Sequence, residues 1–484
     1  MPLRRPSALF FSMASLLSLG LYLLAARLGG FTGFPLDDAW IHQTYARNLA
    51  ALGQFAFVSG QPSAGSTSPL WTVLLAFGYL LRIEYHLWTY ALGAGLLALN
   101  AWLVQRLTLD LWPERPAAAL AAGLFAALEW RLVWAAASGM ETLLFSALAL
   151  AVFVMDRRRP TLAGLCLGLS VLARPDGLTL LPFALARLAL ARPGRVRGIL
   201  ECGAAFAVVF IPYLGLNYAL SGSLWPNTFY AKQAEYAILR AAPLLERAAR
   251  VGLLPFVGAP ALLAPGLAGA AIRWGREQRW GALLPLGWAL TFLAAYIVRL
   301  PVTYQHGRYL IPVIPVLAAV GVGGLADLLR LRAPTLLPRV VSRVWTLAAA
   351  LLLAVFLGVG AQAYARDVQI IESEMVAAAL WVNAYTPPGA LIAAHDIGAL
   401  GYFGGRPILD LAGLASPEVI PFIRDEARLG EWLRASGAQY LVTFPGWYPG
   451  LTGALAADRV FTTGAPFSPA AGGENMAVYA LPGR

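Results

Sequence analysis

The chain has 484 residues, of which 59% are hydrophobic and only 13% are charged, whereas soluble domains average roughly 25% charged residues. Apolar runs of membrane-spanning length recur from residue 7 to residue 363, which excludes an ordinary soluble protein and predicts a polytopic membrane protein. In such a protein the net charge of +11 indicates basic cytoplasmic loops rather than nucleic-acid binding.

The first predicted span covers residues 7–29. Arg4 and Arg5 precede it, and positive residues favour the cytoplasmic side of the membrane. We therefore expect a cytoplasmic N-terminus and an outer loop over residues 30–85.

Two adjacent carboxylates, Asp37 and Asp38, stand in this outer loop just beyond the first span. Charged side chains beside lipid are expensive, so their presence there suggests a chemical reason. Apolar residues at helical spacing predict a short helix from Asp38 to Leu52.

The remaining topology follows from the triplet Arg157-Arg158-Arg159, which should face the cytoplasm. This holds if the short apolar segment 68–82 is an outer-surface or re-entrant helix and does not span. About eleven spans then alternate across the plasma or inner membrane of a bacterium or archaeon. After the first, we predict them at residues 86–106, 117–135, 139–155, 160–173, 177–192, 197–219, 252–272, 280–298, 309–328 and 343–363.

Composition changes near residue 365, where long apolar runs give way to alternating helix-like and strand-like segments. We predict an all-α membrane domain over 1–364 and a small extracytoplasmic α/β domain over 365–484. Strands are expected at 390–394, 407–411, 440–444 and 476–481, and helices at 372–385 and 417–434.

With this topology, the unusual polar clusters fall at outer helix ends or in the outer domain. They are Asp37-Asp38 with His42, Glu141, Arg174 with Asp176, Asn227 with Lys232, His306 with Arg308 and Tyr309, and His395-Asp396. Convergence on one side is what a single site at the outer membrane boundary requires.

Each cluster also has a purely structural interpretation. Adjacent aspartates can begin a helix, and Glu141 suits the positive end of a helix dipole. Arg174 and Asp176 can form a local ion pair in a turn. Other clusters can mark a turn (Asn227), an interfacial aromatic and basic belt (His306, Arg308, Tyr309) or a strand end (His395, Asp396).

The residue types predict transfer of a group from a lipid-phosphate donor. A carboxylate can act as general base toward an acceptor hydroxyl, and cationic side chains can hold the departing phosphate. No P-loop, Rossmann or Ser-His-Asp motif is recognisable. Asp37, Asp38 and Glu141 could bind a divalent cation, but their spacing is not diagnostic, so we predict neither a cofactor nor a metal site.

At these residues the chain resembles the GT-C superfamily of multi-spanning glycosyltransferases that use polyprenyl-phosphate sugars. The shared pattern is an acidic pair in the first outer loop, a second acidic position in the next, and a soluble C-terminal domain. The segments Leu36–Ile41, Tyr45–Asn48, Thr67–Trp71, Ala173–Gly177, Pro226–Tyr230, Arg308–Tyr309 and His395–Gly401 resemble the bacterial arabinofuranosyltransferase-like branch.

The resemblance implies inverting transfer of arabinofuranose, or of another pentose or hexose, to an extracytoplasmic glycan, lipid or protein acceptor. It carries the base over to Asp37, although Asp38 could equally hold that role. The expected phosphate contacts are Arg174, His306, Arg308, Lys232 and Tyr309. The expected acceptor or supporting groups are Glu141, His42, Asp176, Asn227, His395 and Asp396.

Two other classes of function remain open. A lipid-linked saccharide flippase or transporter would need polar residues through the membrane midplane. A binding scaffold would use the outer domain alone.

Overall fold

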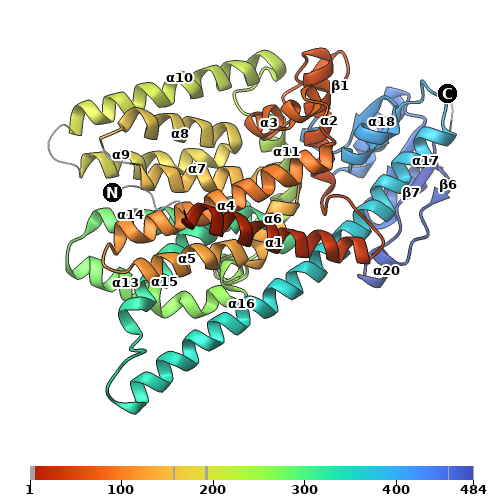
Figure 1. Cartoon of the computed structure of the whole chain (residues 1–484). Helices are drawn as coiled ribbons and strands as arrows, with labels where there is room; N and C mark the ends of the chain where they lie inside the picture. Colours follow the sequence, from red (N-terminus) through yellow and green to blue (C-terminus); the bar gives the residue numbers. More distant parts are fainter. Residues whose placement is uncertain (1–5, 156–157, 191–194, 456, 483–484) are drawn as a thin grey trace.

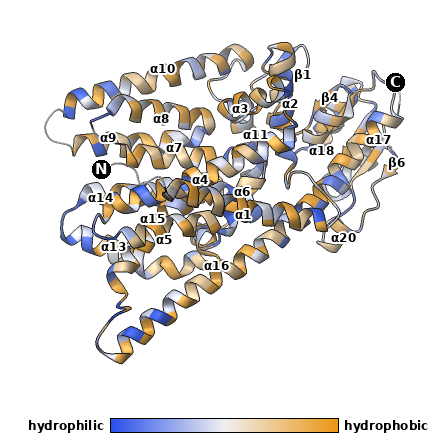
Figure 2. Cartoon of the chain, viewed as in Figure 1, coloured by the Kyte–Doolittle hydropathy of each residue, from blue (hydrophilic) through white to orange (hydrophobic). Residues whose placement is uncertain are grey.

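The computed structural model describes residues 6–155, 158–190, 195–455 and 457–482. Helices form a large bundle, and a small domain with a five-stranded sheet lies at one end of it (Figure 1). Hydrophobic residues dominate along the bundle helices, while hydrophilic residues gather near helix ends (Figure 2). Arg4, Arg5 and Arg157, which support the predicted topology, lie outside the described residues.

The chain begins with α1 (Pro6–Leu28) and continues into the short helix α2 (Asp37–Leu52), one residue longer than predicted. Gly53 ends α2 in the left-handed conformation, with φ 66°, which glycine adopts without steric cost. The hairpin of β1 (Ala56–Val58) and β2 (Gln61–Pro62) follows. With only 12 residues, α3 (Pro69–Leu80) packs along α2, as expected of a non-spanning helix.

A helix occupies each position at which a span was predicted. The bundle elements after α3 are α4 (Tyr85–Leu111), α5 (Pro116–Leu128), α6 (Trp130–Ala137), α7 (Thr142–Val154), α8 (Pro160–Ala173), η1 (Pro175–Leu180), α9 (Leu181–Ala189), α10 (Arg195–Ser221), α11 (Asn227–Glu235), η2 (Tyr236–Ala241), α12 (Leu244–Gly252), η3 (Leu254–Phe256), η4 (Ala259–Leu263), α13 (Ala264–Arg276), α14 (Trp280–Arg299), η5 (Gln305–Val313), α15 (Ile314–Leu328) and α16 (Leu336–Ile371).

These helices differ widely in length. Within the described ranges, six helices are long and apolar enough to cross a membrane, or eight if each bent pair is one span. By contrast, α7, α8 and α9 have 13, 14 and 9 residues, below the roughly 20 needed to cross the hydrocarbon core. Each of the eleven predicted spans therefore coincides with helical structure. Within the described residues, however, at most eight of these segments are long and apolar enough to cross a membrane.

A buried carboxylate explains the 50° bend between α5 and α6. Glu129 accepts hydrogen bonds from the N–H groups of Arg131 and Leu132, at 3.0 and 2.9 Å, and so caps a new helix. Its side chain also lies 3.5 Å from the Arg131 guanidinium. The bend directs α6 toward the bundle end that carries the sheet domain (Figure 1).

The sheet domain, residues 372–482, follows α16 without a break in the helix at residue 365. Its elements are η6 (Glu372–Val376), α17 (Ala377–Tyr385), β3 (Ile392–Ala394), η7 (Leu400–Gly404), β4 (Ile408–Asp410), η8 (Pro417–Phe422), α18 (Glu426–Ser436), β5 (Tyr440–Thr443), η9 (Pro445–Trp447), α19 (Pro449–Ala454), β6 (Asp458–Thr462), α20 (Phe467–Ala470) and β7 (Ala477–Ala480). All four predicted strands are confirmed, and β6 was not predicted.

The strand order β4-β3-β5-β7-β6 determines where polar side chains meet. Strands β4, β3 and β5 are parallel, so their carboxyl ends share one edge of the sheet. Residues that follow β3, β4 and β5, including His395, Ala412 and Trp447, line a cavity against the bundle. This is the edge at which parallel sheets commonly place ligand-binding groups.

Candidate functional site at the junction of bundle and sheet domain

Two cavities meet where the bundle contacts the sheet domain. The first, here called the bundle cavity, has a volume of about 230 Å³ and is mostly apolar. The second, the interface cavity, has a volume of about 690 Å³ and lies between the bundle and the sheet domain. Lys232, Arg308 and Tyr309 line both cavities, so a cationic wall separates them.

Asp38 stands at this wall. Its Oδ2 atom accepts a hydrogen bond from Nη2 of Arg308 at 2.5 Å and lies 3.8 Å from Nζ of Lys232. Burial alone would raise the pKa of Asp38, but the two cations outweigh burial and hold that pKa well below its usual range. Asp38 is therefore ionised at every physiological pH while these partners remain.

Asp37 has a different environment. Its Oδ2 accepts from the N–H of Gly398 at 2.7 Å, and its Oδ1 accepts from the N–H of Ala399 at 2.8 Å. A Cβ on residue 398 would lie 2.0 Å from the Asp37 carbonyl oxygen, so only glycine fits this contact. Burial, with the nearby charge of Asp396, raises the pKa of Asp37 despite the two N–H donors. Asp37 thus connects the first turn of α2 to the sheet domain through two hydrogen bonds.

Arg308 has free hydrogen-bonding capacity. It follows a turn in which His306 and Gly307 have positive φ, at 60° and 70°. Its Nη2 contacts Asp38 and the Tyr309 hydroxyl, the latter at 3.1 Å. Its buried Nε and Nη1 atoms have no hydrogen-bond partner among the described residues. Buried unsatisfied donors on a cation are what an anionic ligand would need.

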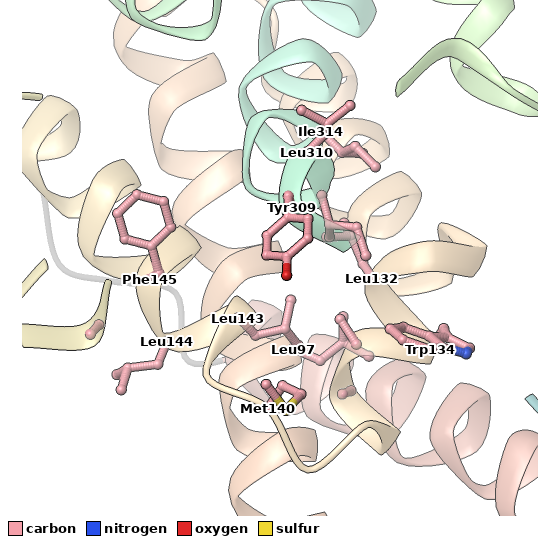
Figure 3. Close-up of a cluster of buried hydrophobic side chains, with 14 of the residues drawn as sticks. Leu97, Leu132, Trp134, Met140, Leu143, Leu144, Phe145, Tyr309, Leu310 and Ile314 are labelled. Carbon is pink, nitrogen blue, oxygen red and sulfur yellow. The ribbon is translucent and has the colours of Figure 1, made fainter. Parts of the chain in front are cut away.

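Within the bundle, the side chains that surround Tyr309 are apolar. Tyr309 projects among Leu97, Leu132 and Leu143 from α4, α6 and α7 (Figure 3). These side chains are buried in one continuous core. The phenol is therefore held firmly where it lines the two cavities.

A second polar group lines the bundle cavity around Arg174. Its Nη2 donates to Oδ2 of Asp176 at 2.8 Å and to the Tyr296 hydroxyl at 2.8 Å. Its Nη1 lies 3.4 Å from Oε1 of Glu141, whose other oxygen lies 3.4 Å from Nε2 of His42. This buried network satisfies most of the guanidinium with protein partners.

The sheet domain contributes the opposite wall of the interface cavity. Nε2 of His395 lies 3.4 Å from Oε1 of Glu235, and Nδ1 hydrogen-bonds the Tyr448 hydroxyl at 2.8 Å. Asp396 lies beside them, and its buried Oδ2 has no hydrogen-bond partner within the ranges that the structure describes. Trp447 completes this wall.

The structure therefore brings together most of the predicted site residues. Asp37, Asp38, Lys232, Arg308, Tyr309, His395 and Asp396 line the interface cavity, and Glu141, Arg174 and Asp176 line the bundle cavity. Asn227 lies just outside, where its amide donates to the Leu414 carbonyl at 3.0 Å and joins α11 to the sheet domain.

His306 is not brought to either cavity. Its Nε2 lies 2.8 Å from Oδ2 of Asp367, and its ring packs edge-on against Trp130 and Trp134. The predicted phosphate contact is therefore not part of the arrangement described above.

The carboxylates do not fit a divalent cation. No group of three His, Cys, Asp or Glu side chains within the described residues could hold a metal ion. Asp37 binds backbone N–H groups, Asp38 pairs with two cations, and Glu141 faces Arg174 and His42.

Several residues of the site carried no recognisable signal in the sequence. Tyr296 lies inside the apolar helix α14, Glu235 ends α11, and Trp447 follows β5. For Trp447, a position three residues beyond the predicted strand 440–444, near the sheet edge where ligands commonly bind, was the one available clue.

Comparison with known proteins supports the architecture. The chain aligns over 97% of its length with 97% of ArnT from Cupriavidus metallidurans, at 14% identity and a TM-score of 0.61 in the apo state. The same protein bound to undecaprenyl phosphate gives 15% identity and a TM-score of 0.60, with 97% of each chain covered.

Two further structures share this fold. An oligosaccharyltransferase from Archaeoglobus fulgidus has 13% identity and a TM-score of 0.62, with 91% of this chain and 70% of that chain covered. The mycobacterial arabinofuranosyltransferase AftD has 16% identity and a TM-score of 0.52, with 98% of this chain and 40% of that chain covered.

Sequence comparisons provide less information than the structural comparisons. Residues 362–479 match a family model described as a domain of unknown function (DUF8728). Among curated proteins, no sequence matches the chain. The chain thus has the fold that the resemblance to the GT-C superfamily implied, with several apolar helices of membrane-spanning length.

Proposed function

We propose that the chain is an integral membrane glycosyltransferase that moves a sugar from a polyprenyl-phosphate donor to an extracytoplasmic acceptor. The observation that carries this proposal is the cationic wall, where Arg308 has unsatisfied buried donors beside Lys232 and Asp38. The shared fold of ArnT bound to undecaprenyl phosphate supports a polyprenyl phosphate as ligand. We propose that the transferred sugar is arabinofuranose or another pentose or hexose.

In this reaction the donor phosphate binds Arg308 and Lys232, and its lipid follows the apolar bundle cavity. The acceptor enters through the interface cavity. An acceptor oxygen attacks the anomeric carbon as the bond from that carbon to the phosphate oxygen breaks, and the configuration inverts. The departing phosphate keeps the bonding electrons, and the two cations stabilise its charge. The acceptor proton passes to a carboxylate.

Of the two aspartates, we assign the proton to Asp38. Both oxygens of Asp37 already accept backbone hydrogen bonds, whereas Asp38 lies at the junction of the two cavities. Pairing with Arg308 makes Asp38 a weak base in the free protein. A donor phosphate would compete for the same guanidinium, which would restore the basicity of Asp38 at the moment when it is needed.

Transfer of a labelled sugar in proteoliposomes tests this proposal, with a lipid-linked sugar as donor. We expect Asp38→Asn to lower kcat/KM by about 10²- to 10⁴-fold, the usual contribution of a general base. Full activity in Asp37→Asn, Asp38→Asn and the double variant would overturn the proposal. Movement of labelled donor across the membrane without transfer would favour the flippase alternative.

A further inference from the structure

The wall that the sheet domain contributes to the interface cavity combines an exposed indole with carboxylate acceptors. Trp447 is 49% exposed, although its ring also packs edge-on against His395, with centroids 5.1 Å apart. It belongs to η9, which begins two residues after β5 ends, and Tyr448 beside it is anchored through its hydroxyl to His395. The indole is thus held on a rigid support with half of its surface free.

In this wall the donors already have partners: Arg424 donates to the Glu235 carbonyl, and the Tyr448 hydroxyl hydrogen-bonds His395. Asp396 presents a buried carboxylate oxygen without a partner among the described residues. His395 is occupied on both ring nitrogens, by Tyr448 and Glu235. Across the cavity, Lys232 and Arg308 both pair with Asp38, and the remaining donors of Arg308 belong to the phosphate site proposed above. An incoming ligand therefore meets an unpaired negative acceptor next to an open aromatic face.

We propose that this wall is a binding site for the acceptor and that the acceptor is a neutral sugar of a glycan. This inference rests on the proposed function and narrows its acceptor to one chemical class. Sugar hydroxyls donate hydrogen bonds to carboxylates, and the C–H face of a sugar ring packs on an indole. An anionic sugar would place a second negative charge beside Asp396 in a partly buried site, which is unfavourable. A peptide could also donate to Asp396, so it is the competing outcome of the test.

The test measures binding to the full chain in lipid nanodiscs by saturation-transfer NMR and titration calorimetry. The probes are neutral tetrasaccharides of mannose, galactose, glucose and arabinose, a tetragalacturonate as anionic sugar, and an uncharged blocked tetrapeptide. We expect at least one neutral tetrasaccharide to bind, and the tetragalacturonate to bind at least about tenfold more weakly.

Three variants locate the site. Trp447→Ala should weaken tetrasaccharide binding about tenfold, because the aromatic platform is lost, and Trp447→Phe should restore part of the affinity. Asp396→Asn should weaken it and reduce the discrimination against tetragalacturonate. The control is Tyr385→Ala, a residue of the same domain that is 71% exposed and does not line the interface cavity.

Binding of undecaprenyl phosphate, measured in the same samples, separates this inference from the proposed function. If undecaprenyl phosphate binds but no tetrasaccharide does, the sugar assignment is wrong and the proposed function stands. The assignment is also overturned if Trp447→Ala leaves sugar affinity unchanged or if the tetrapeptide binds more tightly than every sugar. If undecaprenyl phosphate fails to bind, the proposed function itself is wrong.

Discussion

Asp37 and Asp38 are neighbours in sequence but have different partners because consecutive helical residues point about 100° apart around the axis. Asp37 reaches backbone N–H groups in the sheet domain, and Asp38 reaches Arg308, whose side chain comes from a residue 270 positions further along the chain. The sequence predicted a functional acidic pair but left both aspartates open as the base. Long-range partners determine the difference, and they are visible only in the folded chain.

At Arg308, the unsatisfied donors allow a direct prediction. Replacement by alanine should weaken undecaprenyl phosphate binding about 10- to 100-fold, because a charge-assisted contact to the phosphate is lost. Calorimetry in nanodiscs measures this. Arg197→Ala is the matched control, since the Arg197 side chain is 87% exposed and pairs with Glu201 one turn further along the same helix. Equal losses in both variants would show that net charge, rather than this site, governs binding.

Among the elements, α2 and the turn after β3 form one of the contacts that join the bundle to the sheet domain. Gly398→Ala should loosen it, because a Cβ there would lie 2.0 Å from a backbone oxygen that cannot move away easily. We expect a loss of about 1–3 kcal/mol, the usual cost of overpacking, and faster proteolysis between bundle and sheet domain. Gly389→Ala is the control, since nothing lies within 4 Å of its added Cβ. Indistinguishable thermal midpoints for the two variants would contradict this account.

The contact between α11 and β3 depends on pH through His395. Burial lowers the pKa of His395, but Glu235 and Asp396 outweigh burial and raise it to about 8, from 6.5 in the unfolded chain. The stabilisation is therefore complete below pH 6.5 and is lost as pH rises through 8, amounting to at most about 2 kcal/mol. The thermal midpoint of the wild type should fall over this window more than that of Glu235→Gln. If the thermal midpoints of the two proteins fell equally over this pH window, the pair of His395 and Glu235 would not be the cause of the pH dependence.

The elements also show where sequence patterns are informative. Short apolar segments predicted four strands correctly because β3, β5 and β7 are largely buried and β4 is partly buried. Strand β6 was missed because its exposed sequence, Asp458–Thr462, lacks that pattern. Hydropathy placed the bundle helices and predicted the bounds of α8, but it overestimated the lengths of α7 and α9, because apolar residues such as Met140 and Leu178 continue beyond the helix ends.

In the whole molecule, the polar clusters that the sequence placed on one side do gather at one end of the bundle. His306 lies outside both cavities, because its left-handed backbone turns it toward Asp367 and two tryptophans, and His42 and Asn227 also line neither cavity. A sequence pattern carries no information about such a turn in a residue other than glycine. The division into a bundle cavity and an interface cavity was likewise not predicted, because it arises from docking of the sheet domain against α2 and α11.

The most direct measurement is a structure of the full chain with undecaprenyl phosphate bound. We expect phosphate oxygens to lie within hydrogen-bonding distance of the Arg308 guanidinium and the Lys232 ammonium. We also expect the lipid to follow the bundle cavity and the pair between Asp38 and Arg308 to be loosened. A phosphate bound elsewhere on the chain, with that pair intact, would contradict the proposed function.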